Sequence, residues 1–136
     1  MRKTGPMRFT EHELTAALTG TAKALLASDR KQRRKGVDVE TAWAEMDRYQ
    51  RFVMLDALGE QVLPVLVALP DAPVEPGTRP SYDDQVVADV VSGLVGEDRG
   101  RVRRAVEVKA RTALVQVALA HVPPRLDPDA LLTDES

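Results

Sequence analysis

The feature that most constrains the fold of this sequence is the recurrence of apolar residues at intervals of three and four. Between residues 86 and 95 they occur as pairs four residues apart, Val86/Val87, Val90/Val91 and Leu94/Val95. Pairs at this interval line one side of an α-helix, whereas a half-exposed strand would alternate singly. The valines are weak evidence for strands, because the chain has no isoleucine and uses fourteen arginines against five lysines. This bias is typical of a GC-rich genome, and we expect a bacterial source.

A helix-start signal lies near the N-terminus. Thr10 and Glu13 have the spacing of a capping box, in which the threonine hydroxyl accepts from the backbone N–H of Glu13 and the glutamate reaches back to residue 10. Apolar residues then repeat at helical spacing as far as a charged segment, residues 29–36, that ends in glycine. We therefore expect a helix that ends near Ser28.

Asp38 is a favourable N-cap for a second helix, which we expect to continue to about residue 57. Asp47 and Arg51 are spaced for an ion pair on its outer surface. Phe52 and Leu55 fall on the otherwise polar side, so either a third element buries them or they are offered to a partner. The main apolar face contains Val39, Ala42, Trp43, Met46, Tyr49, Val53 and Ala57.

Proline residues interrupt the pattern after this helix. Pro64 cannot donate to a helical ladder and clashes with the carbonyl four residues before it. We therefore expect either a kink at Pro64 or a break followed by a short fifth helix. Residues 70–80 contain four prolines and a glycine, which predicts a long extended loop.

The last apolar segment predicts a long helix from about Glu97 to His121, ended by two prolines. One apolar face of this helix contains Val102, Val106, Ala110, Ala113, Val117 and Ala120, and Val108, Val115 and Leu119 lie more than 90° away from it. From Thr112 onward almost every residue is apolar, so we expect this helix to be central and contacted on several sides.

Together these patterns predict an all-α fold, a small helical bundle of four main helices in a single domain that spans residues 1–136. A hydrophobic fraction of 43% is sufficient for one core. We expect residues 1–8 and 123–136 to form flexible or loosely docked tails.

Charge is unevenly distributed along the chain. Residues 1–35 carry nine basic and three acidic residues, whereas residues 36–98 carry three basic and thirteen acidic ones. The two parts either pack side by side or mark a surface for a charged partner. If the loop 30–35 met the start of the last helix, the combined basic patch would favour the phosphates of a nucleic acid. The residues of this alternative are Arg30, Lys31, Arg33, Arg34, Lys35, Arg101, Arg103 and Arg104.

No motif indicates catalysis or cofactor binding. The absence of cysteine excludes thiolate metal sites and thiol nucleophiles, and neither His12 nor His121 has a partner at metal-ligand spacing. We therefore predict no catalytic, cofactor-binding or metal-binding residues. The N-terminal residues lack the apolar stretch of a signal peptide, and no segment approaches the ~18 apolar residues of a membrane span, so we expect a cytoplasmic protein.

The remaining interpretation is a non-enzymatic protein-interaction or regulatory module. We expect it to bind a protein partner or a second copy of itself as a homodimer. Trp43, Phe52 and Leu55 are the residues that we expect at the contact surface, together with the proline-rich loop. Nucleic-acid binding through the basic residues is the alternative.

Overall fold

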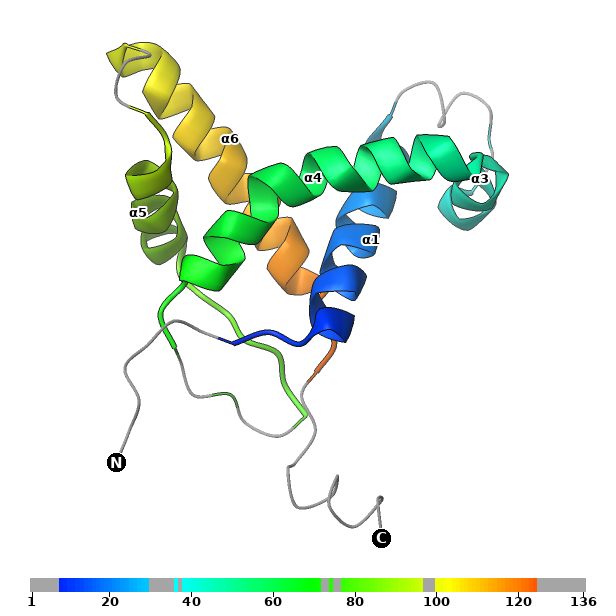
Figure 1. Cartoon of the computed structure of the whole chain (residues 1–136), viewed down its shortest axis with the longest axis horizontal. Helices are drawn as coiled ribbons and strands as arrows, with labels where there is room; N and C mark the ends of the chain where they lie inside the picture. Colours follow the sequence, from blue (N-terminus) through cyan, green and yellow to red (C-terminus); the bar gives the residue numbers. More distant parts are fainter. Residues whose placement is uncertain are drawn as a thin grey trace, which may run out of the picture.

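A computed structural model of the chain describes residues 8–29, 36, 38–71, 74, 77–96 and 100–124. Within these residues it is helical and has no β-strand, so the all-α prediction is confirmed. Predictions for residues 1–7, 30–35 and 125–136 lie outside the described part of the chain. The described helices are α1 (Glu11–Ser28), α3 (Val39–Glu45), α4 (Arg48–Ala68), α5 (Asp84–Leu94) and α6 (Arg101–Ala120) (Figure 1).

Local hydrogen bonds explain where the first helices begin. The capping box of α1 is formed, with the Thr10 hydroxyl accepting from Glu13 N at 3.0 Å and the Glu13 carboxylate accepting from Thr10 N at 2.9 Å. Asp38 starts α3 by accepting from the backbone N–H of Thr41 at 2.8 Å. That hydrogen bond favours the ionised carboxylate and lowers the pKa of Asp38 below its ordinary value of 3.8.

The hydrophobic core lies where the second half of α4 meets α5, α6 and the middle of α1 (Figure 1). The second residue of each apolar pair near α5 lies in this core. These residues are Val87, Val91 and Val95, on the side of α5 that packs against α4 and α6. The largest fully buried side chains are Leu66, Leu69, Val62, Val65, Val87, Val91, Val115 and Val122. The proline-rich segment after α4 is non-helical at each of its described positions, as predicted.

The predicted second helix is wrong in its middle, because a new helix begins at Asp47. The Asp47 carboxylate accepts from Gln50 N at 2.8 Å, and the Gln50 side chain accepts from Asp47 N at 3.1 Å. Asp47 therefore caps α4 and does not pair with Arg51. The break also removes the continuous apolar face, and Tyr49 and Val53 are 73% and 45% exposed.

A short fifth helix after Pro64 is also wrong. The additional short helix is α3, which lies before α4, and α4 continues through Pro64 to Ala68. Figure 1 shows α4 changing direction partway along its length, as expected of a helix with an internal proline.

The structure also corrects the prediction of which side of α6 is buried. Thr112, Val115 and Leu119 are buried, whereas Val102 and Val106 are 77% and 62% exposed. The neighbouring helices α1, α4 and α5 pack on the side of α6 that carries Val115 and Leu119. α6 contacts three helices, α1, α4 and α5, as expected of a central helix, but Val102 and Val106 of its first half stay exposed.

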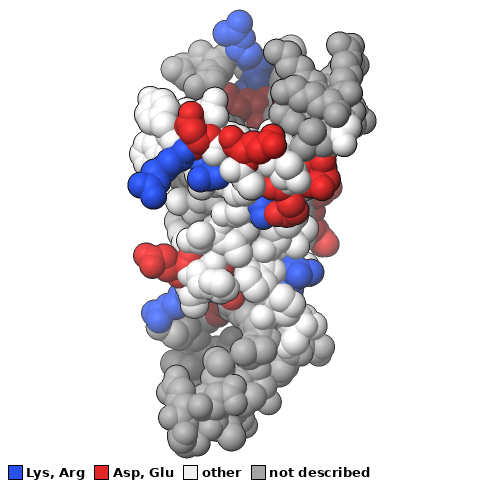
Figure 2. All heavy atoms as spheres, turned by 90° about the vertical axis from the view of Figure 1, so that its right-hand side faces the viewer, with Lys and Arg blue, Asp and Glu red and all other residues white. Residues whose placement is uncertain are grey.

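α3 and the first half of α4 extend from the core as an arm, seen at the right of Figure 1. Every residue of α4 before Leu58 is exposed or only partly buried. α1 packs against α3, and Lys23 of α1 forms an ion pair of 2.9 Å with Glu40 of α3. Figure 2 shows this end of the molecule, where charged side chains of both signs lie on a largely uncharged surface.

Candidate protein-interaction site

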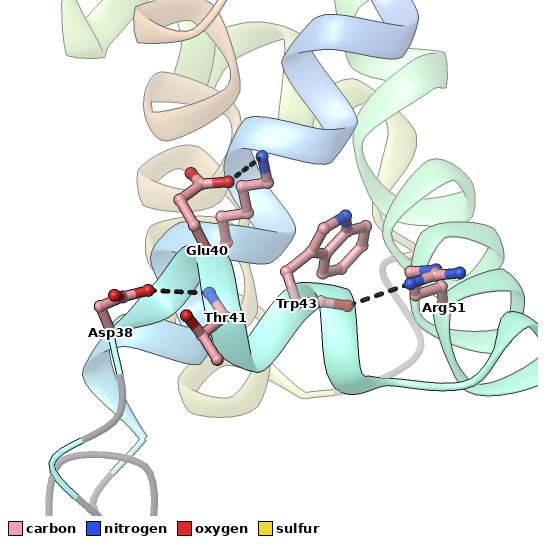
Figure 3. A network of polar contacts seen from close by, with 6 residues as sticks. Asp38, Glu40, Thr41, Trp43 and Arg51 are labelled. Atoms are coloured by element: carbon pink, nitrogen blue, oxygen red, sulfur yellow. Dashed lines mark hydrogen bonds and ion pairs between the residues drawn. The ribbon is translucent and has the colours of Figure 1, made fainter.

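The junction between α3 and α4 is fixed by one arginine (Figure 3). Arg51, in the first turn of α4, donates from a terminal guanidinium nitrogen to the carbonyl of Trp43 at 3.1 Å and lies 3.5 Å from the carbonyl of Ala44. Carbonyls in the last turn of a helix have no partner within that helix. The Trp43 carbonyl also accepts from the backbone N–H of Met46 at 3.3 Å, so Arg51 adds a second hydrogen bond at the end of α3 and links α4 to it.

Beside this junction, α4 and α1 form an apolar groove of about 550 Å³. Gly59 lies buried among its lining residues, and a Cβ there would contact the Leu63 side chain at 3.5 Å and that of Leu18 at 3.7 Å. We use the name α4 groove for the surface formed by Leu18, Phe52, Leu55, Gly59, Leu63, Pro64 and Val67.

The α4 groove exposes large apolar side chains together, not singly. Phe52 is 61% exposed and Val67 is 50% exposed, at opposite ends of the groove. Scattered exposed apolar residues are normal on a protein surface, whereas a contiguous group marks an interaction site. Asp56 and Glu60 also line the groove and are exposed, so its edge carries negative charge.

The structure brings together two of the three residues that the sequence indicated for a contact surface. Phe52 and Leu55 both line the α4 groove. Trp43 lies on α3, is partly buried, and is not part of the groove lining. The described residues of the proline-rich loop do not line it either. Leu18 and Gly59 were not identified from the sequence, because nothing local to them indicates that α1 packs beside α4.

A second apolar surface lies on the side of α6 that faces away from the core. Its valines, Val102 and Val106, border a shallow hollow of about 540 Å³ at the start of the helix. Arg101, Arg103 and Lys109 are exposed beside or within it. The sequence identified most of this face, but its exposure follows only from the packing. We use the name α6 stripe for Val102, Ala105, Val106, Ala110 and Ala113, all of which are exposed.

The arginines proposed for nucleic-acid contact have unequal environments. Arg104 is partly buried and donates to the Ser92 carbonyl at 2.7 Å in the last turn of α5. Arg101 and Arg103 are exposed. The basic loop 30–35 lies outside the described residues. The end of α1 and the start of α3, which precede and follow it in sequence, lie far from the start of α6 in Figure 1. Nucleic-acid contact stays a prediction.

A more polar groove of about 780 Å³ lies between α5 and α6. At one end, the Gln116 side-chain amide donates to the Tyr82 carbonyl at 2.8 Å and to the Asp84 carboxylate at 2.9 Å. Thr112, in the groove wall, is 8% exposed, and among the described residues its hydroxyl has no hydrogen-bond partner. An unpaired buried hydroxyl lowers stability unless another group satisfies it.

Replacing Thr112 by valine is therefore expected to raise the free energy of unfolding, because it replaces an unpaired hydroxyl with a methyl group of similar size. Thr21→Val is the matched control, since the Thr21 hydroxyl is fully buried and donates to the Ala17 carbonyl at 2.7 Å. The two variants are expected to differ by about 1 kcal/mol in urea unfolding, with Thr112→Val the more stable. A loss of stability in Thr112→Val equal to that in Thr21→Val would show that the Thr112 hydroxyl is satisfied.

The described part of the chain contains no group of three or more His, Cys, Asp or Glu side chains that could hold a metal ion. Among its helices, none combines the length and the apolar character needed to cross a lipid bilayer. Comparison with protein-family models, with curated proteins and with solved structures finds no match to this chain.

Proposed function

We propose that this protein is a non-enzymatic interaction module that associates with a second copy of itself through the α4 groove. The observation that supports this most strongly is the exposed Phe52 ring within an apolar groove that Leu55, Leu63 and Val67 also line. Aromatic anchors next to apolar hollows are where protein interfaces concentrate their binding energy. Burying these side chains removes apolar area from water and so favours association.

The contacts that join the arm to the rest of the molecule support the same proposal. Association loses translational, rotational and side-chain freedom, and a surface that is already ordered loses less. Arg51 holds α4 to α3, and the Lys23–Glu40 ion pair joins α3 to α1, whose Leu18 forms one wall of the groove. The ion pair is exposed and contributes little by itself, so we assign the fixed geometry mainly to Arg51 and to packing.

A copy of the same chain is a suitable partner because of charge. The edge of the α4 groove carries Asp56 and Glu60, while another exposed apolar surface of the chain, the α6 stripe, lies among basic residues. Complementary charge of this kind selects the correct partner and orientation.

Phe52→Ser is expected to weaken self-association by at least about tenfold in dissociation constant, as truncating an interface anchor does. Sedimentation velocity across a micromolar concentration series measures it, with the wild-type chain sedimenting above the monomer mass. Leu94→Ser is the matched control, because Leu94 is an exposed apolar residue, 47% accessible, outside the groove. A wild-type chain that stays monomeric throughout, or a Phe52→Ser series identical to wild type, would contradict the proposal.

A further inference from the structure

We infer that the surface that occupies the α4 groove is the α6 stripe of a second copy. This inference rests on the proposed self-association and adds the identity of the mating surface. In one chain the stripe is exposed, with Val102 at 77% and Val106 at 62%, while Phe52 of the groove is 61% exposed. A chain therefore does not fill its own groove with its own stripe, and the contact joins different copies.

The side chains of the two surfaces suit a contact between two helices. The α4 groove follows α4 from Phe52 to Val67, and the buried Gly59 lies between them. The apolar members of the α6 stripe are valines and alanines, and Lys109 lies among them. Small side chains on one helix allow close approach to another, and the separation of packed helices depends on the size of the residues at their contact. The valines and alanines of the stripe therefore permit a close approach to α4.

The charges of the two surfaces are opposite. Asp56 and Glu60 line the groove, whereas Arg101 and Arg103 flank the stripe and Lys109 lies within it; all five are exposed. In a contact between two α4 grooves, Asp56 and Glu60 of both copies would face each other. Like charges placed together at an interface oppose association, and opposite charges favour it. Charge therefore selects groove against stripe over groove against groove.

Because the groove and the stripe are different surfaces, damage to either one should reduce assembly. Closed two-fold pairs would contain two such contacts, and open chains would contain one per neighbour. Mixing two damaged chains then distinguishes this arrangement from a symmetric α4 contact. A variant with a damaged groove keeps an intact stripe, and a variant with a damaged stripe keeps an intact groove. The intact stripe of the first can therefore bind the intact groove of the second.

The first experiment is sedimentation velocity of Val106→Glu, Phe52→Ser and their equimolar mixture, with Leu94→Glu as the control for placing a glutamate on an exposed apolar position. Each single variant is expected to raise the dissociation constant at least about tenfold, and the mixture is expected to form a one-to-one complex. Unchanged assembly of Val106→Glu would overturn the inference while leaving the proposed function intact if Phe52→Ser still disrupts it. A monomeric wild-type chain would contradict the proposed function itself.

The second experiment reverses the charges. Asp56→Lys with Glu60→Lys is expected to weaken assembly at low salt, and adding Arg101→Glu with Arg103→Glu in the same chain is expected to restore it. Circular dichroism on each variant verifies that the helices are retained. Restoration requires that the groove and the stripe meet. If the quadruple variant retains its helices but recovers no assembly, the inference is overturned.

Discussion

Replacing Leu66 by alanine is expected to lower the free energy of unfolding by about 2–5 kcal/mol. Leu66 is fully buried in the core, together with Val62 and Leu69 of the same helix and with valines of α5 and α6. Removing most of its side chain loses hydrophobic burial and leaves a cavity that the surrounding helices fill only in part. Urea unfolding followed by circular dichroism measures the change.

The neighbouring residue supplies the control. Val67 is 50% exposed, so Val67→Ala is expected to change stability by less than about 0.5 kcal/mol. Both variants must be compared at concentrations where the chain is monomeric, because Val67 lines the α4 groove and association would add to apparent stability. Equal losses in the two variants would contradict a helix that passes through Pro64 with Leu66 directed into the core.

The second large effect is expected at Gly20, where α1 crosses the end of α6. Alanine is normally the better residue in a helix, by about 1 kcal/mol. Here its Cβ would lie 2.3 Å from Cγ and 2.5 Å from Cβ of His121. The histidine Cβ cannot rotate away from this contact, so the end of α6 must move. Gly20→Ala is therefore expected to lose about 1–3 kcal/mol, as over-packed cores do.

Gly93→Ala tests the same substitution without the collision. Gly93 lies in α5 with no atom within 4 Å of its would-be Cβ, so alanine there is expected to stabilise the chain by up to about 1 kcal/mol. The double variant Gly20→Ala/His121→Gly removes the obstructing side chain and is expected to regain stability relative to Gly20→Ala. If Gly20→Ala and Gly93→Ala both stabilised the chain, the close crossing of α1 and α6 would be wrong.

Local chemistry was sufficient to predict where several helices begin. The Thr10 capping box and the Asp38 cap involve residues three apart, so their hydrogen bonds form within one turn. The same kind of signal marked the break before α4, since Asp47 and Gln50 form a capping box as well. From the sequence alone this signal is not decisive, because the segment fits a continuous helix with one apolar face and an Asp47–Arg51 ion pair equally well.

The choice between apolar faces could not be made locally. α6 has apolar residues on two sides, and which side is buried depends on where α1, α4 and α5 pack against it. Val115 lies in the core and Val106 is exposed, although both are valines in the same helix. Periodicity gives the angle between two residues on a helix but not the direction of the neighbouring helix.

The candidate site was predictable only in part for the same reason. Phe52 and Leu55 stood out because they were apolar on a polar side of their helix, and both line the groove. Leu18 lies more than thirty residues before Phe52 in the chain, and Gly59 has no side chain that could stand out in the apolar pattern. Their role follows only from the packing of α1 beside α4.

The most direct test of the account is an amide nuclear magnetic resonance spectrum of the full-length chain, recorded as its concentration is raised. Self-association through the two surfaces predicts that amide signals shift or broaden in α4 around Phe52 and Gly59, and in α6 around Val102 and Val106. The signal of Leu94, in α5 outside both surfaces, should stay constant. Spectra that do not change with concentration, or changes confined to helices other than α4 and α6, would contradict it.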